Sequence, residues 1–110
     1  MSIDFAGLLD APAYDTFGVL VVLTAIDRAA LTVTALDKIV EVEEAGASGV
    51  IVPTLRPAID VRLADLEAAN LAREDLVKAE VTFGGVRYRV LATEPTSNAR
   101  ELRLILIEDP

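Results

Sequence analysis

The stretch from Ala79 to Thr93 decides the fold, and it reads Ala-Glu-Val-Thr-Phe-Gly-Gly-Val-Arg-Tyr-Arg-Val-Leu-Ala-Thr. Gly84-Gly85 separates two runs of alternating residues, which is a strong local signal for a two-residue β-hairpin loop. Such a loop pairs Phe83 with Val86, Val81 with Tyr88 and Ala79 with Val90 on one face, and Thr82 with Arg87 and Glu80 with Arg89 on the other. The first face is wholly apolar and the second is polar, so this register predicts a hairpin with one buried face.

A third strand follows the hairpin. Pro95 to Ala99 consists of turn formers, and the chain then resumes an alternating pattern. One face of this strand carries Leu102, Leu104 and Leu106, and the other carries Arg103, Ile105 and Ile107. Apolar groups on both faces predict that the core covers one side and that an N-terminal helix or another subunit covers the other.

The middle of the chain supplies further strands. Gly18–Thr24 is short, β-branched and apolar on both faces, which suits a central or doubly covered strand. Leu31–Ala35 is the expected return strand, and Lys38–Val42 extends it past an irregularity at Asp37. Val50–Val52 begins another strand, which Pro53 restricts to an edge or an end.

The next segment alternates again and then changes composition. Ile59, Val61 and Leu63 share one face, whereas Asp60 and Arg62 share the other. Residues 64–70 are rich in Ala, Leu and Glu, which predicts one or two helical turns. No βαβ pattern is present, so we expect an all-β, mainly antiparallel fold: a single domain over residues 1–110, built as a small six- to seven-stranded barrel or sandwich.

Two segments are expected to lie outside that barrel. Residues 1–12 are predicted to form a short helix or arm, because Phe5, Leu8 and Leu9 share one helical face and Pro12 ends it. It either covers a sheet edge or docks on a neighbouring subunit. Residues 41–49 combine glutamates with small residues, which predicts an exposed, flexible acidic and glycine-rich loop that is either simply solvated or functional.

Composition excludes several classes of function. The chain of 110 residues has no Cys and no His, and this removes disulfides, cysteine nucleophiles and the commonest general base and metal ligand. The net charge of −8 argues against binding to the phosphates of a nucleic acid or to an anionic membrane. The longest apolar run, Phe17–Ile26, is too short for a membrane-spanning helix.

A search for catalytic motifs gives the same answer. The serines at 2, 48 and 97 fall in expected termini or turns, and nothing places Lys38 or Lys78 beside one of them. Gly46 and Gly49 are not followed by the residues of a phosphate-binding loop. The sequence therefore predicts no catalytic, metal-binding or cofactor-binding residues, no cofactor and no enzymatic activity.

The order of strands and turns in the second half of the chain resembles a known family. The pattern runs from Val61-Arg62-Leu63-Ala64-Asp65-Leu66 through Asp75-Leu76-Val77 to the Gly84-Gly85 hairpin with Tyr88 and Val90, and ends in Leu102-Arg103-Leu104-Ile105-Leu106. It is similar to the small head–tail joining, or head-completion, proteins of tailed bacteriophages and gene transfer agents. Glu74-Asp75 and Pro95-Thr96-Ser97-Asn98 stand where that family often has Gly-Asp and Pro-Asp-Gly.

The resemblance implies a structural function. It implies a β-barrel of the stopper type that forms a ring with copies of itself between a portal or adaptor protein and a tail protein. DNA would pass through this ring without specific binding, and the protein would be made in the bacterial cytoplasm and end in the virion. A tail-terminator subunit and a monomeric β-barrel that binds a peptide or small ligand are the alternatives. The candidate interface residues are Phe5, Leu8, Leu9, Glu41, Glu43, Glu44, Gly46, Ser48, Ile105 and Ile107.

Overall fold

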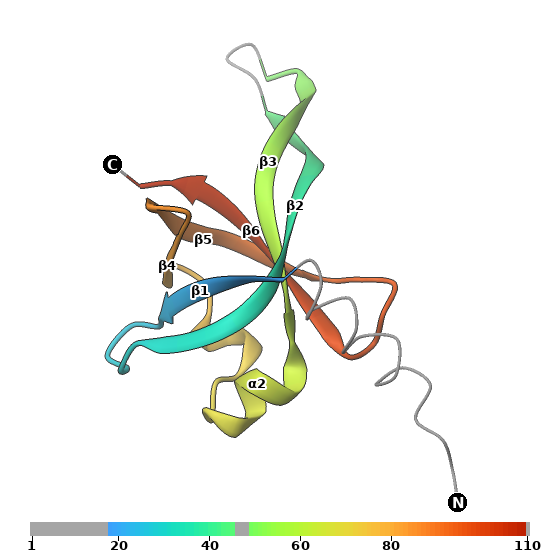
Figure 1. The fold of residues 1–110 in the computed structure, drawn as a ribbon. Helices are drawn as coiled ribbons and strands as arrows, with labels where there is room; N and C mark the ends of the chain where they lie inside the picture. The colour runs from blue at the N-terminus through green and yellow to red at the C-terminus, as the bar shows by residue number, and fades with distance from the viewer. Residues whose placement is uncertain (1–17, 46–48, 110) are drawn as a thin grey trace, which may run out of the picture.

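Six antiparallel strands close into a barrel in the computed structural model, which describes residues 18–45 and 49–109 (Figure 1). The strands are β1 (Gly18–Thr24), β2 (Leu31–Ala45), β3 (Ile51–Arg62), β4 (Glu80–Phe83), β5 (Val86–Pro95) and β6 (Glu101–Glu108). Their order around the barrel is β1-β2-β3-β6-β5-β4, and β4 pairs back onto β1. The prediction of an all-β, mainly antiparallel barrel is confirmed.

The β4–β5 hairpin has the register that the sequence predicts. Val81 lies opposite Tyr88 and Phe83 lies opposite Val86. Gly84 and Gly85 have φ angles of 59° and 75°. These left-handed values match the two-residue turn whose twist suits paired strands, and glycine adopts them without a steric penalty. The rings of Phe83 and Tyr88 stack at a centroid distance of 4.9 Å beside the core.

The barrel interior is aliphatic. Alternate residues of every strand point inward, and they bury the core side chains Val21, Leu23, Val33, Ala35, Ile59, Val61, Val81, Val90, Leu102, Leu104 and Leu106. The helix α2 (Leu63–Ala68) and the short 3-10 helix η1 (Arg73–Asp75) lie in the connection between β3 and β4. Leu66, Leu71 and Leu76 from this connection join the same core. The helical turns predicted over residues 64–70 are thus present as α2, which begins and ends slightly earlier.

Strands β2 and β3 continue well past the barrel. β2 pairs with β1 only up to Leu36, and β3 pairs with β6 only from Ala58 onward. Beyond these points the two strands pair, among the described residues, only with each other, from Ile39 opposite Pro57 to Ala45 opposite Ile51. We call this two-stranded projection, Ile39–Ala45 with Ile51–Pro57, the finger. At ~3.3 Å per residue it is about 20 Å long, and the protein measures 57 × 29 × 25 Å along its principal axes.

The finger differs from the sequence prediction in two respects. Residues 41–45, which we predict as part of a loop, lie in strand β2, and β2 has no break at Asp37. β3 likewise runs unbroken through Pro53 and Pro57, so Pro53 does not end the strand; it lies where β3 pairs with β2 but not with β6, which is the edge position that the sequence predicts as the other alternative. The reason is physical: an exposed ribbon has no buried face to maintain, so charged and small residues are compatible with its pairing.

The outer wall of the barrel is covered unevenly. On β1, Leu20 is 72% exposed and Val22 is 39% exposed. Of the two predicted alternatives, β1 is therefore a central strand, paired with β2 and β4, and not a doubly covered one. On β3 and β6, by contrast, Ala58 and Ile105 lie opposite each other on the outer wall and are both buried. Coverage of both faces, predicted for the last strand, therefore holds at Ile105, whereas Ile107 is 37% exposed.

Candidate interaction surface

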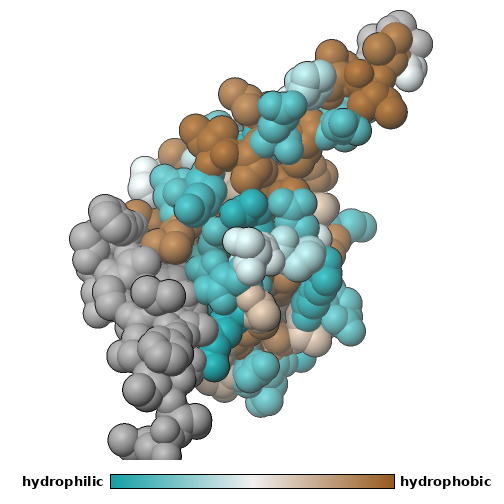
Figure 2. Space-filling model, turned by 90° about the vertical axis from the view of Figure 1, so that its right-hand side faces the viewer, coloured by the Kyte–Doolittle hydropathy of each residue, from teal (hydrophilic) through white to brown (hydrophobic). Residues whose placement is uncertain are grey.

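One face of the finger exposes large aliphatic side chains. We call it the aliphatic face, and its residues are Ile39, Glu41, Glu43, Ile51, Pro53, Leu55 and Pro57, which share one parity in the β2–β3 register. Ile39 is 75% exposed, Leu55 is 70% exposed and Ile51 is 64% exposed. Figure 2 shows hydrophobic residues along this projection at the top of the molecule.

The aliphatic face continues the inward-facing side of the barrel. Ile59 and Val61 have the same parity as Leu55, and both are fully buried in the barrel core. Because side chains alternate strictly along a strand, the same alternation carries the apolar pattern outward onto the finger. No other described strand lies opposite it there, since the finger pairs only within itself. The finger therefore presents a surface that is patterned like a core but exposed to solvent.

Two carboxylates interrupt this apolar surface. Glu41 lies opposite Leu55, and Glu43 lies opposite Pro53. Both glutamates are exposed, and the ion pairs found among the described residues do not include them. The aliphatic face thus carries two negative charges that nothing in the described chain neutralises.

The opposite face of the finger is organised by an ion pair. Arg56 Nε donates a hydrogen bond to Glu44 Oε1 at 2.7 Å, and Arg56 Nη2 donates to Glu44 Oε2 at 2.8 Å. The pair spans the row formed by Val42 and Thr54, which lie between the two residues in the register. The hydrogen bond from Arg56 lowers the pKa of the Glu44 carboxyl, and the same bond raises the pKa of Arg56. A bidentate arginine–carboxylate pair holds both side chains in one geometry.

The free edge of β3 in the finger is protected by proline. The backbone N–H of Leu63 points toward β6, since it donates to the Arg100 carbonyl at 2.9 Å. Backbone groups alternate in direction along a strand, and Pro53 and Pro57 lie an even number of residues before Leu63, so their backbone faces the same side. Since β2 and β3 pair without a register shift, the backbone of both prolines points toward the free edge. Proline has no N–H, so alternate donors are missing from that edge. An extended chain cannot add there as a regular further strand.

A second ion pair holds the outer wall of the barrel. Arg103 Nε donates to Asp60 Oδ1 at 2.8 Å, and Arg103 Nη2 donates to Asp60 Oδ2 at 3.1 Å. The Asp60 side chain is 3% exposed and the Arg103 side chain 24%. The hydrogen bond to Asp60 raises the pKa of Arg103. This pair joins neighbouring strands β3 and β6, so its role is to fix the wall of the barrel and not to offer a reactive group.

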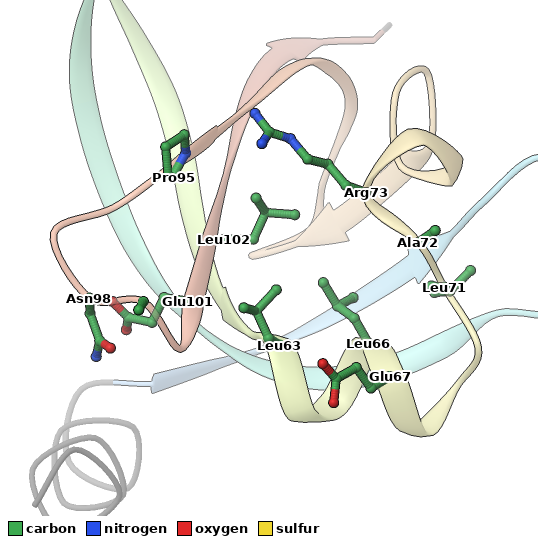
Figure 3. Close-up of a pocket in the computed structure, with 11 residues that line it drawn as sticks. Leu63, Leu66, Glu67, Leu71, Ala72, Arg73, Pro95, Asn98, Glu101 and Leu102 are labelled. Carbon is green, nitrogen blue, oxygen red and sulfur yellow. The ribbon is translucent and has the colours of Figure 1, made fainter.

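A pocket of about 390 Å³ lies between α2 and the β5–β6 turn (Figure 3). Leu63, Leu66 and Leu102 form its apolar part, and Arg73 lies on its rim. Arg73 is held there because its Nε donates to Thr93 Oγ1 at 2.9 Å and its Nη2 donates to the Thr93 carbonyl at 3.1 Å. The pocket provides apolar contact with few polar groups.

The predicted interface residues fall into three groups. Phe5, Leu8, Leu9, Gly46 and Ser48, with the predicted helix at residues 1–12, lie outside the described residues. Glu41 and Glu43 lie on the aliphatic face of the finger, whereas Glu44 lies on the opposite face in its pair with Arg56. Ile105 is buried, and Ile107 is partly exposed on the far end of β6.

The sequence prediction missed the aliphatic residues of the finger. Ile39, Ile51 and Leu55 are more exposed than Ile107, yet none of them is among the predicted interface residues. One signal could have identified them: the odd-numbered apolar positions of the core strand continue backward from Ile59 through Leu55 to Ile51. The two prolines within that run conceal it, because proline usually indicates the end of a strand.

The described residues offer neither a metal site nor a membrane-spanning helix. Within residues 18–45 and 49–109, no group of acidic side chains is placed to hold a metal ion. None of the helices in that part of the chain is long and apolar enough to cross a membrane.

Comparison with known proteins identifies the family. A family model described as Phage Head-Tail Attachment protein matches residues 1–107. A search of curated proteins gave no match. Because the family model spans almost the whole chain, the chain belongs to the phage head–tail attachment family.

Membership in this family supplies a coarse function. The family is structural, and its members join the head and the tail of a phage virion. The protein therefore has a structural role in the virion and interacts with other head and tail proteins. The family resemblance that the sequence indicates is confirmed.

Proposed function

We propose that this protein is a head-completion subunit of the stopper type, which assembles into a ring between the portal or adaptor protein and the tail of a phage or gene transfer agent particle. The family match over residues 1–107 is the observation that carries this proposal. The shape of the molecule supports it: a closed barrel gives a rigid body, and the finger extends from that body with an exposed apolar face. Exposed apolar patches of this kind are typical of surfaces that bind other proteins.

The charge of the chain is compatible with a DNA passage. A net charge of −8 repels the phosphate backbone, so a ring of such subunits would let DNA pass without holding it. Every copy added to the ring increases this repulsion. The predicted contacts at Phe5, Leu8, Leu9 and Ile107 belong to this proposal as surfaces toward neighbouring subunits or partners.

Two other functions remain candidates. A tail terminator also acts at the head–tail junction, and nothing in the barrel separates it from a stopper. The pocket between α2 and the β5–β6 turn favours a different candidate, a monomeric module that binds a peptide or a small apolar ligand.

Deletion of the gene, followed by electron microscopy of the particles, tests the proposal. We expect DNA-filled or leaking heads beside separate, finished tails, because each half of the particle matures without the joining protein. Expression of the chain from a plasmid should restore joined particles in the same strain.

Other results would point elsewhere. Heads that carry tails of abnormal length would identify a tail terminator. Particles of normal structure and number would contradict a role at the junction and would favour the monomeric binding module.

A further inference from the structure

The finger exposes more aliphatic surface than a solvated arm requires. Its three large aliphatic side chains, Ile39, Ile51 and Leu55, are each more than 60% exposed and share one face. A two-stranded ribbon with no packed face is only marginally stable in water. This pattern is typical of an apolar surface that becomes buried when a second molecule binds to it.

The charges on this face indicate the chemistry of that second molecule. Glu41 and Glu43 are interleaved with the aliphatic side chains, and both are exposed without an ion pair among the described residues. An apolar partner without cations would leave both carboxylates desolvated and unpaired, which is costly. The complementary surface is therefore apolar and flanked by Lys or Arg side chains.

A second copy of this chain does not offer such a surface. The chain has ten basic residues and a net charge of −8. Seven of its eight arginine side chains already have a hydrogen-bond or ion-pair partner within the chain, and Arg100 also interacts within it. In the described part, only the ammonium groups of Lys38 and Lys78 have no such partner. Two acidic copies also repel each other at long range.

The geometry of the finger also determines how a partner binds. Pro53 and Pro57 remove alternate donors from the free edge of β3, so strand addition is blocked there. A partner on the β3 side of the finger must therefore contact side chains and not pair with the backbone. The aliphatic and acidic side chains of the aliphatic face are the groups that it can contact there.

We propose that the aliphatic face of the finger docks on a different protein of the particle, on an apolar surface flanked by basic side chains, and not on a second copy of this chain. This inference rests on the proposed function, since it assigns one surface of the joining protein to its contact with a head or tail component. It leaves contacts between copies to other parts of the molecule.

A joining assay in vitro tests the inference. Heads and tails purified separately from the deletion strain are mixed with purified full-length protein, and joined particles are counted by electron microscopy. The variant Ile39→Ser/Leu55→Ser should lower the yield of joined particles about tenfold or more, because truncation of central apolar contacts is the largest loss at an interface. The matched control Leu20→Ser/Val22→Ser removes exposed aliphatic groups from the barrel wall and should stay within about twofold of wild type.

Charge reversal gives an independent measurement. Glu41→Lys/Glu43→Lys should lower joining about tenfold, whereas Glu67→Lys/Glu74→Lys changes the net charge equally and should have little effect. Added NaCl should slow joining by the wild-type protein more than joining by Glu41→Gln/Glu43→Gln. Sedimentation of the protein first with heads alone and then with tails alone shows which half of the particle carries the complementary surface.

Three results would overturn the inference. Equal joining by wild type and by Ile39→Ser/Leu55→Ser would show that the aliphatic face is not an interface. Loss of self-assembly in that variant, with self-assembly retained by Leu20→Ser/Val22→Ser, would show that the finger contacts a second copy. Failure of the wild-type protein itself to join heads and tails would remove the proposed function, and the inference with it.

Discussion

The barrel and the finger are built from the same two strands, yet different forces hold them. In the barrel, β2 and β3 each have neighbours on both edges, and their inward side chains are fully buried. In the finger, within the part of the chain that the structure describes, they pair only with each other, and the large aliphatic side chains at alternate positions are exposed. The buried contacts that stabilise the fold therefore lie in the barrel, whereas the side chains of the finger are available to contact another molecule. This comparison shows how one alternating pattern supplies both a core and a binding face.

The strongest way to break the barrel is to place a charge in its core. Val81 is fully buried, and we expect Val81→Asp to cost more than about 4 kcal/mol and to leave no folded protein at 25 °C. The amide NMR spectrum of the purified variant checks this. Thr82→Asp, one residue further on the opposite face and beside Arg87, should fold normally. A folded Val81→Asp with an unfolded Thr82→Asp would contradict the register.

The two bidentate ion pairs allow a sharper comparison, because they share geometry and differ in burial. Asp60→Ala removes the bidentate partner of Arg103, and we expect roughly 2–4 kcal/mol of destabilisation. This is slightly below the ~3–5 kcal/mol for fully buried pairs, because Arg103 retains some exposure and its second ion pair with Glu94. Glu44→Ala breaks the finger pair in solvent and should leave the unfolding midpoint unchanged. Urea denaturation of both variants gives the comparison, and equal midpoints would refute it.

Removal of the outer half of the finger should have a smaller effect still. Val42 and Thr54 are paired, so replacing residues 43–53 with Asn-Gly closes a two-residue hairpin between them. The barrel core is untouched, and we expect Tm to change by less than about 5 °C, which corresponds to ~1 kcal/mol in a domain of this size. Calorimetry measures the shift. A loss of cooperative unfolding would mean that the finger supports the barrel.

Acid should weaken the ion pair of the finger. Arg56 lowers the pKa of Glu44 from its ordinary value of 4.5, so the pair contributes fully above pH 4.5 and is lost as the pH falls through the lower folded-state value. A carboxyl-carbon NMR titration of Glu44 measures this directly. In Arg56→Gln the pKa of Glu44 should return toward 4.5. An unchanged titration in that variant would show that Arg56 does not cause the shift.

The barrel was predictable because its signals are local and agree with one another. Gly84-Gly85 fixes a turn, and the alternation on either side fixes the register, so Val81 and Tyr88 could be paired from the sequence alone. Strand β1 was predicted with its observed bounds for the same reason. The pairing of Asp60 with Arg103 was not predictable, since 43 residues separate them and only the closure of the barrel brings them together.

The finger was not predictable from its composition. Glutamates, small residues and prolines are loop signals in a buried context, because a packed strand cannot accept them. On an exposed two-stranded ribbon these residues lower the stability only slightly, so they occur here within strands β2 and β3. Glu41 and Glu43 are predicted interface residues and are exposed, but their aliphatic neighbours Ile39 and Leu55 are not among the predicted residues, because identifying them requires the register of β2 and β3.

The two edge prolines have a consequence for crowding. Several copies held at one junction would keep their ribbons at an effective concentration in the millimolar range. At such density, unprotected strand edges exchange partners and seed fibrils. Pro53 and Pro57 interrupt that route along the β3 edge by removing donors, while the side chains of the aliphatic face remain unaltered. Copies can thus be held close together without pairing along that edge.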